Sequence, residues 1–381
     1  MDNVKELNVV YIGSPVFPIG PAITKRRRFM VDYMNERNIT SHVLVTGLQG
    51  ERNNPSEGIY GNCDYYDIRE VSAFDKIFQY NKLGKKYLKN WFDEGKLNVL
   101  IFTTSMDYVD FFLYRYAKKL GYKIVFDIVE TSFWKHENLG IRTKMIYAIN
   151  HFLTLRAYKN AAAFVISERL HYEIKNTAPS MPICILPNST PIEVKSGRKE
   201  LNETLQILYA GTYASKEGVI FLINGVEKAI AKGYNCKLLL LGKAPEALRN
   251  RYKDSEFIEF KGFVSDDELY RLQLESDVLA MVRTNSKFSN YGFPFKLSEY
   301  LATGNIVLST NVSDVKQYLR DKCDAYLIEP ENSDAICDAI IHIINNPEEA
   351  CAIANNGLHV AYDKFSIQNV GKIFEDFLTK L

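Results

Sequence analysis

The feature that most constrains the fold is an alternation of short apolar runs with longer helical segments, which occurs twice along the 381-residue chain. The runs are rich in β-branched residues and apolar on both faces, as strands buried in a parallel sheet must be. Parallel strands need long crossovers, so we expect helices between most of the runs. Strands are expected at 8–12, 41–46, 98–103, 123–127, 162–166 and 182–186, and then at 206–210, 236–241, 257–260, 278–282 and 305–309.

A linker separates the two arrays. Residues 187–205 hold two prolines, little apolar content and mixed charge. The sequence therefore predicts two consecutive doubly wound α/β domains, residues 1–190 and 191–365, and the length suits two cores. Ligands of such sheets bind beyond the carboxyl ends of the strands, so we expect the site in a cleft that the two Rossmann-like domains face.

Composition and motifs limit the cellular compartment and the cofactor chemistry that we expect. The six cysteines have no metal-ligand spacing, which indicates reduced thiols of a cytoplasmic protein. The polar start runs directly into a strand, so no targeting segment is expected. No run of 18 apolar residues is present, and we expect no membrane span. Both arrays lack the glycine triplet of dinucleotide sites and the lysine loop of P-loop enzymes, which disfavours both chemistries.

Charge is unevenly distributed. Residues 1–190 carry a net charge of +6 and residues 191–381 a net charge of −5. The run 25–28 (KRRR) and a basic amphipathic helix expected at 142–159 lie in the first half. Two explanations stay open: peripheral contact with the anionic inner face of a membrane that carries a lipid-linked acceptor, or ordinary solvated charge. Nucleic acid is not expected as a partner, because the basic residues are not interleaved along one long surface.

The most informative segment is 290–309, NYGFPFKLSEYLATGNIVLS. Pro294 suits a first helical turn and Gly304 the position after the last turn. Lys296 and Glu299 are three positions apart and share one face of this helix. A helix start with a lysine suits a phosphate, and a carboxylate suits the diol of a ribose, so the segment fits a sugar nucleotide. An amphipathic helix with a surface Lys–Glu pair is the alternative.

A second segment, 208–225, ends a strand at Gly211 and opens a helix with Lys216. A cation is disfavoured at the positive end of a helix, and an anionic ligand would resolve that conflict. The alternative is an ordinary exposed lysine. Together the two segments suggest that Lys216 and Lys296 bind a diphosphate.

Six segments of the second half follow a known order: AGTYASKEG, LLLLGKAP, IEFKGFVSDDELYRL, SDVLAMV, GFPFKLSEYLATGNIVLST and FSIQNVGKIFEDFL. In this order they resemble the donor domain of the retaining family 4 glycosyltransferases, in the subgroup with a PxKxxEY motif. The first half is similar more loosely, through Gly20, VFDIVE, VISERL and LPNST. The resemblance implies the GT-B fold, a final helix (366–381) that crosses back to the first domain, and transfer of a sugar from a nucleotide diphosphate sugar with retention.

The resemblance also implies site roles. Lys216 would be catalytic, stabilising the departing diphosphate, and Glu299 would hold the ribose. Further diphosphate contacts would come from Gly20, Gly211, Thr212, Gly292, Phe293 and Lys296, base contacts from Gly262, Phe263 and Val264, and donor-sugar contacts from Asn290 and Tyr291.

Two positions depart from the family pattern. Thr212 stands where many members have an arginine, and Tyr291 stands where the first of two glutamates eight positions apart belongs. Lys296 is a candidate to compensate for the arginine. In the first half, Glu130 is our candidate to orient or deprotonate the acceptor. Asp127 is expected to cap a turn and His136 to lie at the surface.

We expect no metal or other cofactor, because the chain has no Asp-x-Asp motif and the family places no metal at the diphosphate. The nucleotide stays open among UDP, GDP, dTDP and ADP. The expected acceptor is a glycan or lipid-linked glycan in cell-surface polysaccharide assembly. Two rival hypotheses remain: an epimerase or phosphorylase of the same fold, and a partner subunit that has lost turnover.

Overall fold

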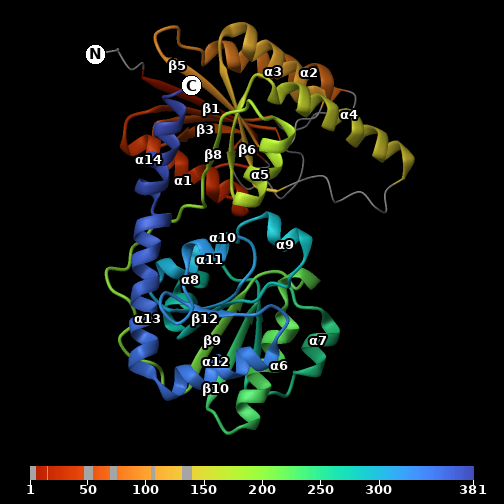
Figure 1. The fold of residues 1–381 in the computed structure, drawn as a ribbon. Coiled ribbons are helices and arrows are strands. Elements are labelled where there is room, and N and C mark those ends of the chain that lie inside the picture. Colours follow the sequence, from red (N-terminus) through yellow and green to blue (C-terminus); the bar gives the residue numbers. More distant parts are fainter. Residues whose placement is uncertain (1–5, 15, 47–54, 69–74, 104–107, 131–139) are drawn as a thin grey trace. The chain divides into compact units, whose positions relative to one another are not determined.

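The computed structural model describes residues 6–14, 16–46, 55–68, 75–103, 108–130 and 140–381. The chain divides into two compact units (Figure 1). Unit 1 comprises residues 1–189 together with 367–381, and unit 2 comprises residues 190–366. Within the described residues, no helix is long and apolar enough to cross a bilayer.

Unit 1 is built on one eight-stranded sheet, parallel except at one edge. Its spatial order is β3 (Glu57–Tyr60), β4 (Cys63–Asp67), β2 (Thr40–Val45), β1 (Leu7–Ser14), β5 (Leu97–Thr103), β6 (Lys123–Ile128), β7 (Ala162–Val165) and β8 (Ile183–Ile185). The central strands are almost fully buried, which the continuous apolar runs predict.

The edge strand β3 and its neighbour β4 were not expected from the sequence. β3 pairs antiparallel with β4, and exposed and more buried residues alternate along both strands. An antiparallel edge with one solvated face has this alternation and no continuous apolar run, which explains why it escapes a search for buried strands.

The helices of unit 1 lie on two faces of the sheet. They are α1 (Ala22–Glu36), α2 (Asp75–Asn90), α3 (Tyr108–Leu120), α4 (Ile141–Tyr158), α5 (Glu168–Thr177) and α14 (Ile367–Leu378). α1 links β1 to β2 in one direction along the sheet, whereas α2, α3 and α4 link strands in the other direction. Right-handed crossovers therefore place α1 and this group on opposite faces.

The C-terminal helix α14 packs against unit 1. The Tyr33 hydroxyl on α1 donates a hydrogen bond of 2.6 Å to Oε2 of Glu375. Phe374 is buried and stacks on Phe164 of β7, with ring centroids 5.2 Å apart. The last residues of the chain thus complete the core that the first residues begin.

Unit 2 has a six-stranded parallel sheet. Its order is β11 (Ile258–Gly262), β10 (Cys236–Leu241), β9 (Leu205–Ala210), β12 (Val278–Met281), β13 (Ile306–Thr310) and β14 (Tyr326–Ile328). The short β14 was not expected. The chain builds outward from β9 in one direction and resumes at β12 in the other, so the β9–β12 pair is a topological switch point.

Helical segments cover both faces of this sheet. They are η1 (Ser215–Glu217), α6 (Val219–Ala231), α7 (Glu246–Arg251), α8 (Asp266–Glu275), α9 (Lys287–Tyr291), α10 (Phe295–Ala302), α11 (Val315–Tyr318), α12 (Ser333–Asn345), α13 (Pro347–Val360) and the π-helical turn η2 (Ala361–Phe365). η1 and α10 flank the switch point, which is where both phosphate-binding lysines are predicted.

Candidate functional site

Two loops are locked together beyond the carboxyl ends of β9 and β12. Gly218 follows η1 with φ +63°, and a Cβ there would press on the carbonyl oxygen of Val282. Only glycine tolerates both this conformation and this approach. The amide of Thr284 donates a 2.9 Å hydrogen bond to the carbonyl of Lys216. The short helix η1 is therefore fixed against the segment that leaves β12.

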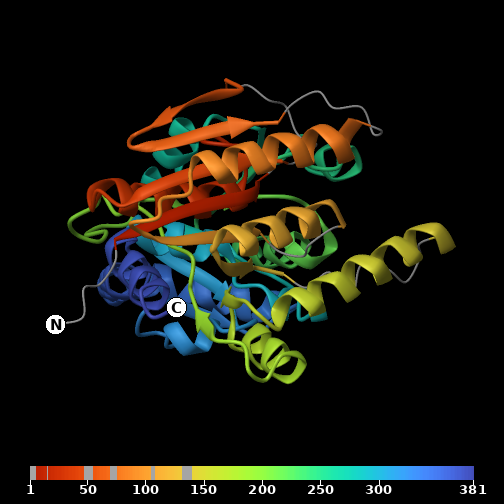
Figure 2. The same ribbon diagram turned by 90° about the horizontal axis from the view of Figure 1, so that it is seen from above.

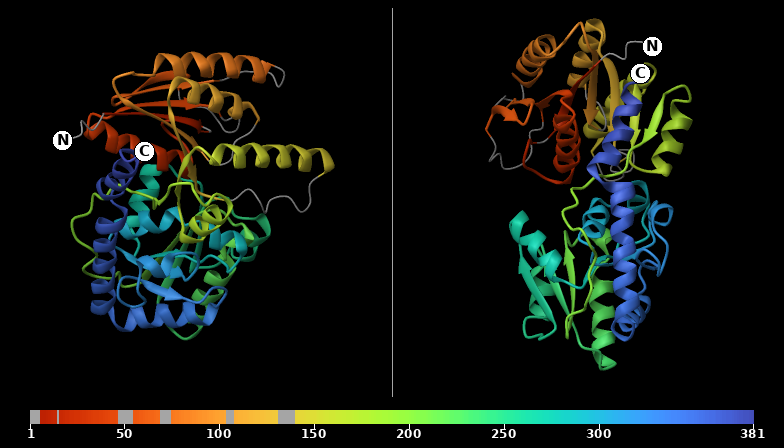
Figure 3. Two further views of the ribbon diagram at one scale, coloured as in Figure 1. Left: turned by 45° about the horizontal axis from the view of Figure 1, so that its top comes forward. Right: turned by 90° about the vertical axis from the view of Figure 1, so that its left-hand side faces the viewer.

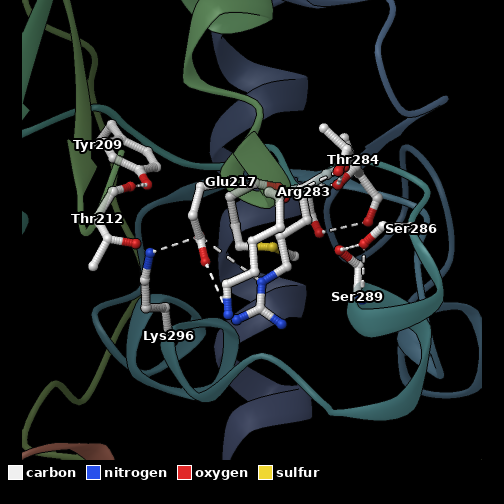
Figure 4. A network of polar contacts seen from close by, with 12 residues as sticks. Tyr209, Thr212, Glu217, Arg283, Thr284, Ser286, Ser289 and Lys296 are labelled. Carbon is white, nitrogen blue, oxygen red and sulfur yellow. Dashed lines mark hydrogen bonds and ion pairs between the residues drawn. The ribbon is translucent and has the colours of Figure 1, made fainter. Parts of the chain in front are cut away.

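A buried carboxylate lies at the centre of this arrangement (Figure 4). Glu217 is 5% exposed and faces three cations. Its Oε2 lies 3.3 Å from Nζ of Lys296 and 3.9 Å from Nε of Arg283, and its Oε1 lies 3.9 Å from Nζ of Lys216. Three positive groups around one negative group leave a net positive charge at the switch point.

Lys296 is held in the site by its surroundings. It lies in the first turn of α10, and its Nζ is 4.9 Å from the ring centroid of Tyr209, a cation–π distance. The ammonium lies where a Cβ on Gly211 would be, so Gly211 makes room for it. Burial lowers the pKa of Lys296, with Arg283 and Lys216 acting in the same direction and Glu217 opposing them. An anionic ligand would favour the charged form.

Arg283 lies two residues after the end of β12, and its side chain is only 16% exposed. The Nε of its guanidinium is buried and has no hydrogen-bond partner in the part of the chain that the structure describes. Buried donors are nearly always satisfied, and arginine matches phosphate geometry well. Arg283 is thus equipped to bind an anion.

The loop that precedes α10 is braced by side chains. The side-chain amide nitrogen (Nδ2) of Asn290 donates to Oδ1 of Asn285 at 2.7 Å and to the carbonyl of Ser286 at 3.0 Å. Its Oδ1 accepts a 2.9 Å bond from the amide of Ser313. The side chain of Asn290, a predicted donor-sugar contact, is therefore engaged in holding loops together.

The other residues of this loop that are predicted to contact the ligand have buried side chains or, as in Gly292, no side chain. Tyr291 and Phe293 are both 4% exposed, and Phe293 packs against Tyr318 and Phe365 with ring centroids 5.0 and 5.7 Å away. Contacts to a ligand from Gly292 and Phe293 would therefore use backbone amides. Pro294 gives α10 no side-chain cap, so no side chain of this residue occupies the first amides of the helix.

The predicted ribose and base contacts lie at the same edge of the sheet. Glu299 is half-buried, one turn after Lys296 on α10. Gly262 ends β11 with φ +78°, and the next ring, Phe263, is 82% exposed. Val264 is half-buried. An exposed aromatic ring beyond a strand end is a suitable surface for a base.

Thr212 is exposed, and its carbonyl accepts a 2.6 Å hydrogen bond from the hydroxyl of Tyr209. The position of the missing arginine thus carries no charge. Arg283, from the neighbouring strand β12, brings a guanidinium to Glu217, at the end of the loop that begins at Thr212.

In unit 1, Gly20 and Glu130 both follow carboxyl ends of strands. A Cβ on Gly20 would press on Val16 and Thr24, whose hydroxyl donates a 3.0 Å bond to the Val16 carbonyl. Glu130 is half-buried after β6. His136 lies outside the described residues.

The KRRR run is not the exposed patch that the sequence suggested. Arg26 and Arg27 are 4% and 3% exposed. Arg26 forms a 3.0 Å ion pair with Asp127 and donates to the carbonyls of Leu186 and Pro187 at 3.0 and 2.9 Å. The prediction for Arg26 and Arg27 as part of a membrane-facing patch is therefore wrong. Asp127, expected to cap a turn, is instead the ion-pair partner of Arg26.

Among the described residues, no group of three or more His, Cys, Asp or Glu is arranged to hold a metal ion. The cation cluster does not need one, since its own side chains supply positive charge. Metal independence remains a prediction.

Sequence reasoning missed Glu217 and Arg283. Both left a signal: Glu217 adjoins the predicted Lys216, and Arg283 follows a buried apolar run at the same edge. What the sequence does not give is that β12 lies beside β9.

The architecture is that of a GT-B protein. Sucrose-phosphate synthase from Thermosynechococcus elongatus has a TM-score of 0.74 and 13% identity, over 99% of both chains. HepE of Anabaena in complex with UDP has a TM-score of 0.68 and 11% identity, over 98% of this chain and 100% of that one. These likenesses confirm the predicted fold class.

Residues 204–346, within unit 2, match the family described as Glycosyl transferases group 1. Over 181 residues the chain is 24% identical to the capsular polysaccharide biosynthesis glycosyltransferase CapM of Staphylococcus aureus. Over 173 residues it is 23% identical to an uncharacterized glycosyltransferase of Methanocaldococcus jannaschii. These alignments cover 46% and 44% of this chain, and 46% and 42% of the two relatives, so the chain matches under half of their length.

Proposed function

We propose that this protein transfers a sugar from a nucleotide diphosphate sugar to a glycan or lipid-linked glycan in cell-surface polysaccharide assembly, with retention. The observation that carries the proposal is the cluster of Lys216, Arg283 and Lys296 around buried Glu217 at the switch point of unit 2. The capsular polysaccharide relative supports the setting, and the likeness to HepE with UDP supports a nucleoside diphosphate as ligand.

The most demanding step of the proposed reaction is the departure of the nucleoside diphosphate. The bond between the anomeric carbon and the β-phosphate oxygen breaks, and a bond from that carbon to an acceptor oxygen forms. The acceptor proton passes to a base, for which Glu130 is our candidate. Negative charge grows on the departing phosphate, and preorganised cations stabilise it best where water is excluded. Lys216, Arg283 and Lys296 supply these cations.

For the remaining residues we propose the roles that the family resemblance implies. Glu299 holds the ribose hydroxyls, and Gly262, Phe263 and Val264 receive the base, with the exposed ring of Phe263 stacking on it. Gly211, Thr212, Gly292 and Phe293 approach the diphosphate through backbone. Asn290 and Tyr291 shape the donor-sugar loop and do not use their side chains on the sugar.

Calorimetric titration with UDP, GDP, dTDP and ADP tests the donor site. We expect one nucleoside diphosphate to bind far more tightly than the others, and Lys216→Ala and Lys296→Ala to weaken that binding. Failure of all four to bind would overturn the proposal. Ligand binding would also raise the melting temperature by mass action, which gives an independent readout.

Transfer, retention and metal independence need separate measurements. A labelled donor incubated with an acceptor should yield a product whose anomeric configuration, read by NMR, matches the donor. The rate should be unchanged by EDTA. Conversion of the labelled donor to another sugar nucleotide without acceptor would favour the epimerase, and donor binding without turnover would favour a partner subunit.

We place the protein in the cytoplasm, touching the inner face of a membrane. A lipid-linked acceptor would be presented there.

A further inference from the structure

Three helices of unit 1, α2, α3 and α4, form one layer over a face of the sheet (Figure 2). They connect β4 to β5, β5 to β6 and β6 to β7, so they follow one another across the sheet. The opposite face is occupied by α1, against which α14 packs. The outer side of the α2–α3–α4 layer faces away from the core of unit 1.

The layer concentrates positive charge. The three segments together contain eleven Lys and Arg and two Asp, a net charge of +9. The whole chain has a net charge of +1, so everything outside the layer sums to −8. Lys82, Lys86 and Lys89 lie on the exposed face of α2, and Arg115, Lys118 and Lys119 on that of α3.

Large apolar side chains are exposed on the same layer. Phe78 of α2 and Phe112 of α3 are exposed. The first nine residues of α4, 141–149, are all exposed, and this part of the helix extends past the sheet (Figure 3). Along α4 the exposed large side chains are Ile141, Met145, Ile146, Tyr147, Ile149 and Phe152.

Water is a poor solvent for such a surface. Contiguous exposed apolar side chains are typical of an interaction site, and scattered single ones are not. Here they are interleaved with cations, including Arg142 and Lys144 in the projecting part of α4, and the described α4 segment contains no Asp or Glu. Apolar side chains that are exposed beside lysines and arginines can enter the headgroup region of a bilayer while the cations attract its anionic lipids.

We infer that the α2–α3–α4 layer binds an anionic lipid bilayer, with α4 inserting its apolar side chains into the headgroup region. Two other occupants fit less well. A symmetric second copy would bring two surfaces of +9 together, which like charges oppose. A nucleic acid would pair with the cations but would leave the aliphatic side chains of Ile141, Met145 and Ile149 in water.

This inference rests on surface chemistry and not on sugar transfer. It deepens the proposed membrane contact: it keeps the helix predicted at 142–159 and excludes Arg26 and Arg27 of the KRRR run, because both are buried. Anionic headgroups attract each basic residue near the surface, so binding must weaken as salt rises.

The experiment is cosedimentation of the full-length protein with vesicles of phosphatidylcholine alone or mixed with phosphatidylglycerol. We expect binding to the mixed vesicles, at least tenfold weaker binding to phosphatidylcholine, and release by high salt. Equal binding to both vesicle types, or none to either, would overturn the inference. Tighter, equally salt-sensitive binding to a DNA duplex would also overturn it. So would a dimer, detected by analytical sedimentation, that the α4 variants convert to a monomer.

Two matched pairs of variants locate the surface. The double variant Ile149→Glu, Phe152→Glu should lose vesicle binding, whereas Ile373→Glu on α14, also exposed, should not. The triple variant Lys82→Gln, Lys86→Gln, Lys89→Gln should weaken it at least tenfold. Its control is the triple variant of exposed lysines in unit 2, Lys199→Gln, Lys232→Gln, Lys253→Gln.

All of these variants change exposed positions, so melting temperature and nucleoside diphosphate binding should be retained. Equal loss of vesicle binding in a variant and its control would contradict the assignment to this layer. A protein that binds vesicles but no nucleotide would sink the proposed function and leave this inference standing.

Discussion

At the scale of single residues, the site depends on charges that come from different strands. Glu217 is the partner of three cations, and its burial means that each of them is positioned before a ligand arrives. Preorganised groups lose little on binding, which is how a small cluster achieves affinity. Arg283 is the clearest case, because its Nε is buried and has no hydrogen-bond partner among the described residues.

Arg283→Gln should weaken binding of the preferred nucleoside diphosphate by roughly 10- to 100-fold, since hydrogen bonds to charged groups are worth about 1.5–3 kcal/mol. Calorimetric titration measures the change. Introducing Thr212→Arg into this variant should restore part of the affinity, because many members of the family that the sequence resembles have an arginine at this position. Unchanged affinity in Arg283→Gln would remove Arg283 from the site.

Lys296 predicts the pH dependence of binding. Burial lowers the pKa of its ammonium, so the charged form that attracts the diphosphate is lost at a lower pH than for an ordinary lysine. Affinity should therefore fall as pH rises into the alkaline range. Lys296→Arg keeps its charge at these pH values and should flatten the profile, which titrations at several pH values would reveal. An identical fall in both proteins would contradict this origin.

Most residues of the site could be named from sequence because they sit in local patterns. Lys216, Lys296 and Glu299 belong to loop–helix starts that are visible in one short segment each. Glu217 and Arg283 could not be named, since their roles depend on which strands are neighbours. Arg26 and Arg27 were misplaced for the same reason: an Asp 101 positions away from Arg26 decides that this arginine is buried.

At the scale of elements, η1 is the smallest unit that the site needs. Three residues of 3₁₀ helix have few hydrogen bonds of their own, so their position depends on Gly218 and on the bond from Thr284 to Lys216. The element carries both Lys216 and Glu217. The geometry of η1 therefore determines where two of the four charged side chains of the site lie.

Gly218→Ala should destabilise the protein by more than about 1–2 kcal/mol, the ordinary cost of a left-handed non-glycine residue, because its Cβ also meets the Val282 carbonyl. Nucleoside diphosphate affinity should fall with it as η1 shifts. The matched control is Gly233→Ala, which has φ +87° but no atom within 4 Å of its Cβ.

Chemical denaturation and calorimetric titration of the two variants separate conformational strain from the clash. Gly233→Ala should show only the conformational cost and full affinity. Equal effects of the two substitutions would mean that the contact between Gly218 and Val282 does not hold η1 in place.

The types of most elements could be predicted from the sequence, but some short or alternating strands could not. Buried strands with continuous apolar runs were located to within a residue or two. The strands β3, β4 and β14 were missed, since β3 and β4 alternate between exposed and more buried residues and a three-residue strand has too little pattern to detect.

At the scale of the whole molecule, the chain contributes to unit 1 from both ends. Phe374 of α14 is 1% exposed and lies in the same core as Tyr11 of β1 and Phe164 of β7. That the final helix returns to the first domain was implied by family resemblance. The residues that this helix covers could not be named from the sequence.

Phe374→Ala should destabilise unit 1 by about 3–5 kcal/mol, the usual cost of deleting a buried aromatic ring. Unit 2 has its own core, so its melting transition should stay where it is and should still rise with the preferred nucleoside diphosphate. Calorimetry with and without that ligand would distinguish the two transitions. A single transition that moves as a whole would show that the units unfold together.

Because residues 190–366 form a continuous stretch and unit 1 is assembled from the two ends, unit 2 is topologically an insertion within unit 1. During vectorial synthesis the inserted unit emerges complete, whereas its host must wait for the last turns of the polypeptide. A nascent or truncated chain that stops before Ile367 would leave Tyr11 and Phe164 without their covering ring. The covering of these two rings therefore depends on α14.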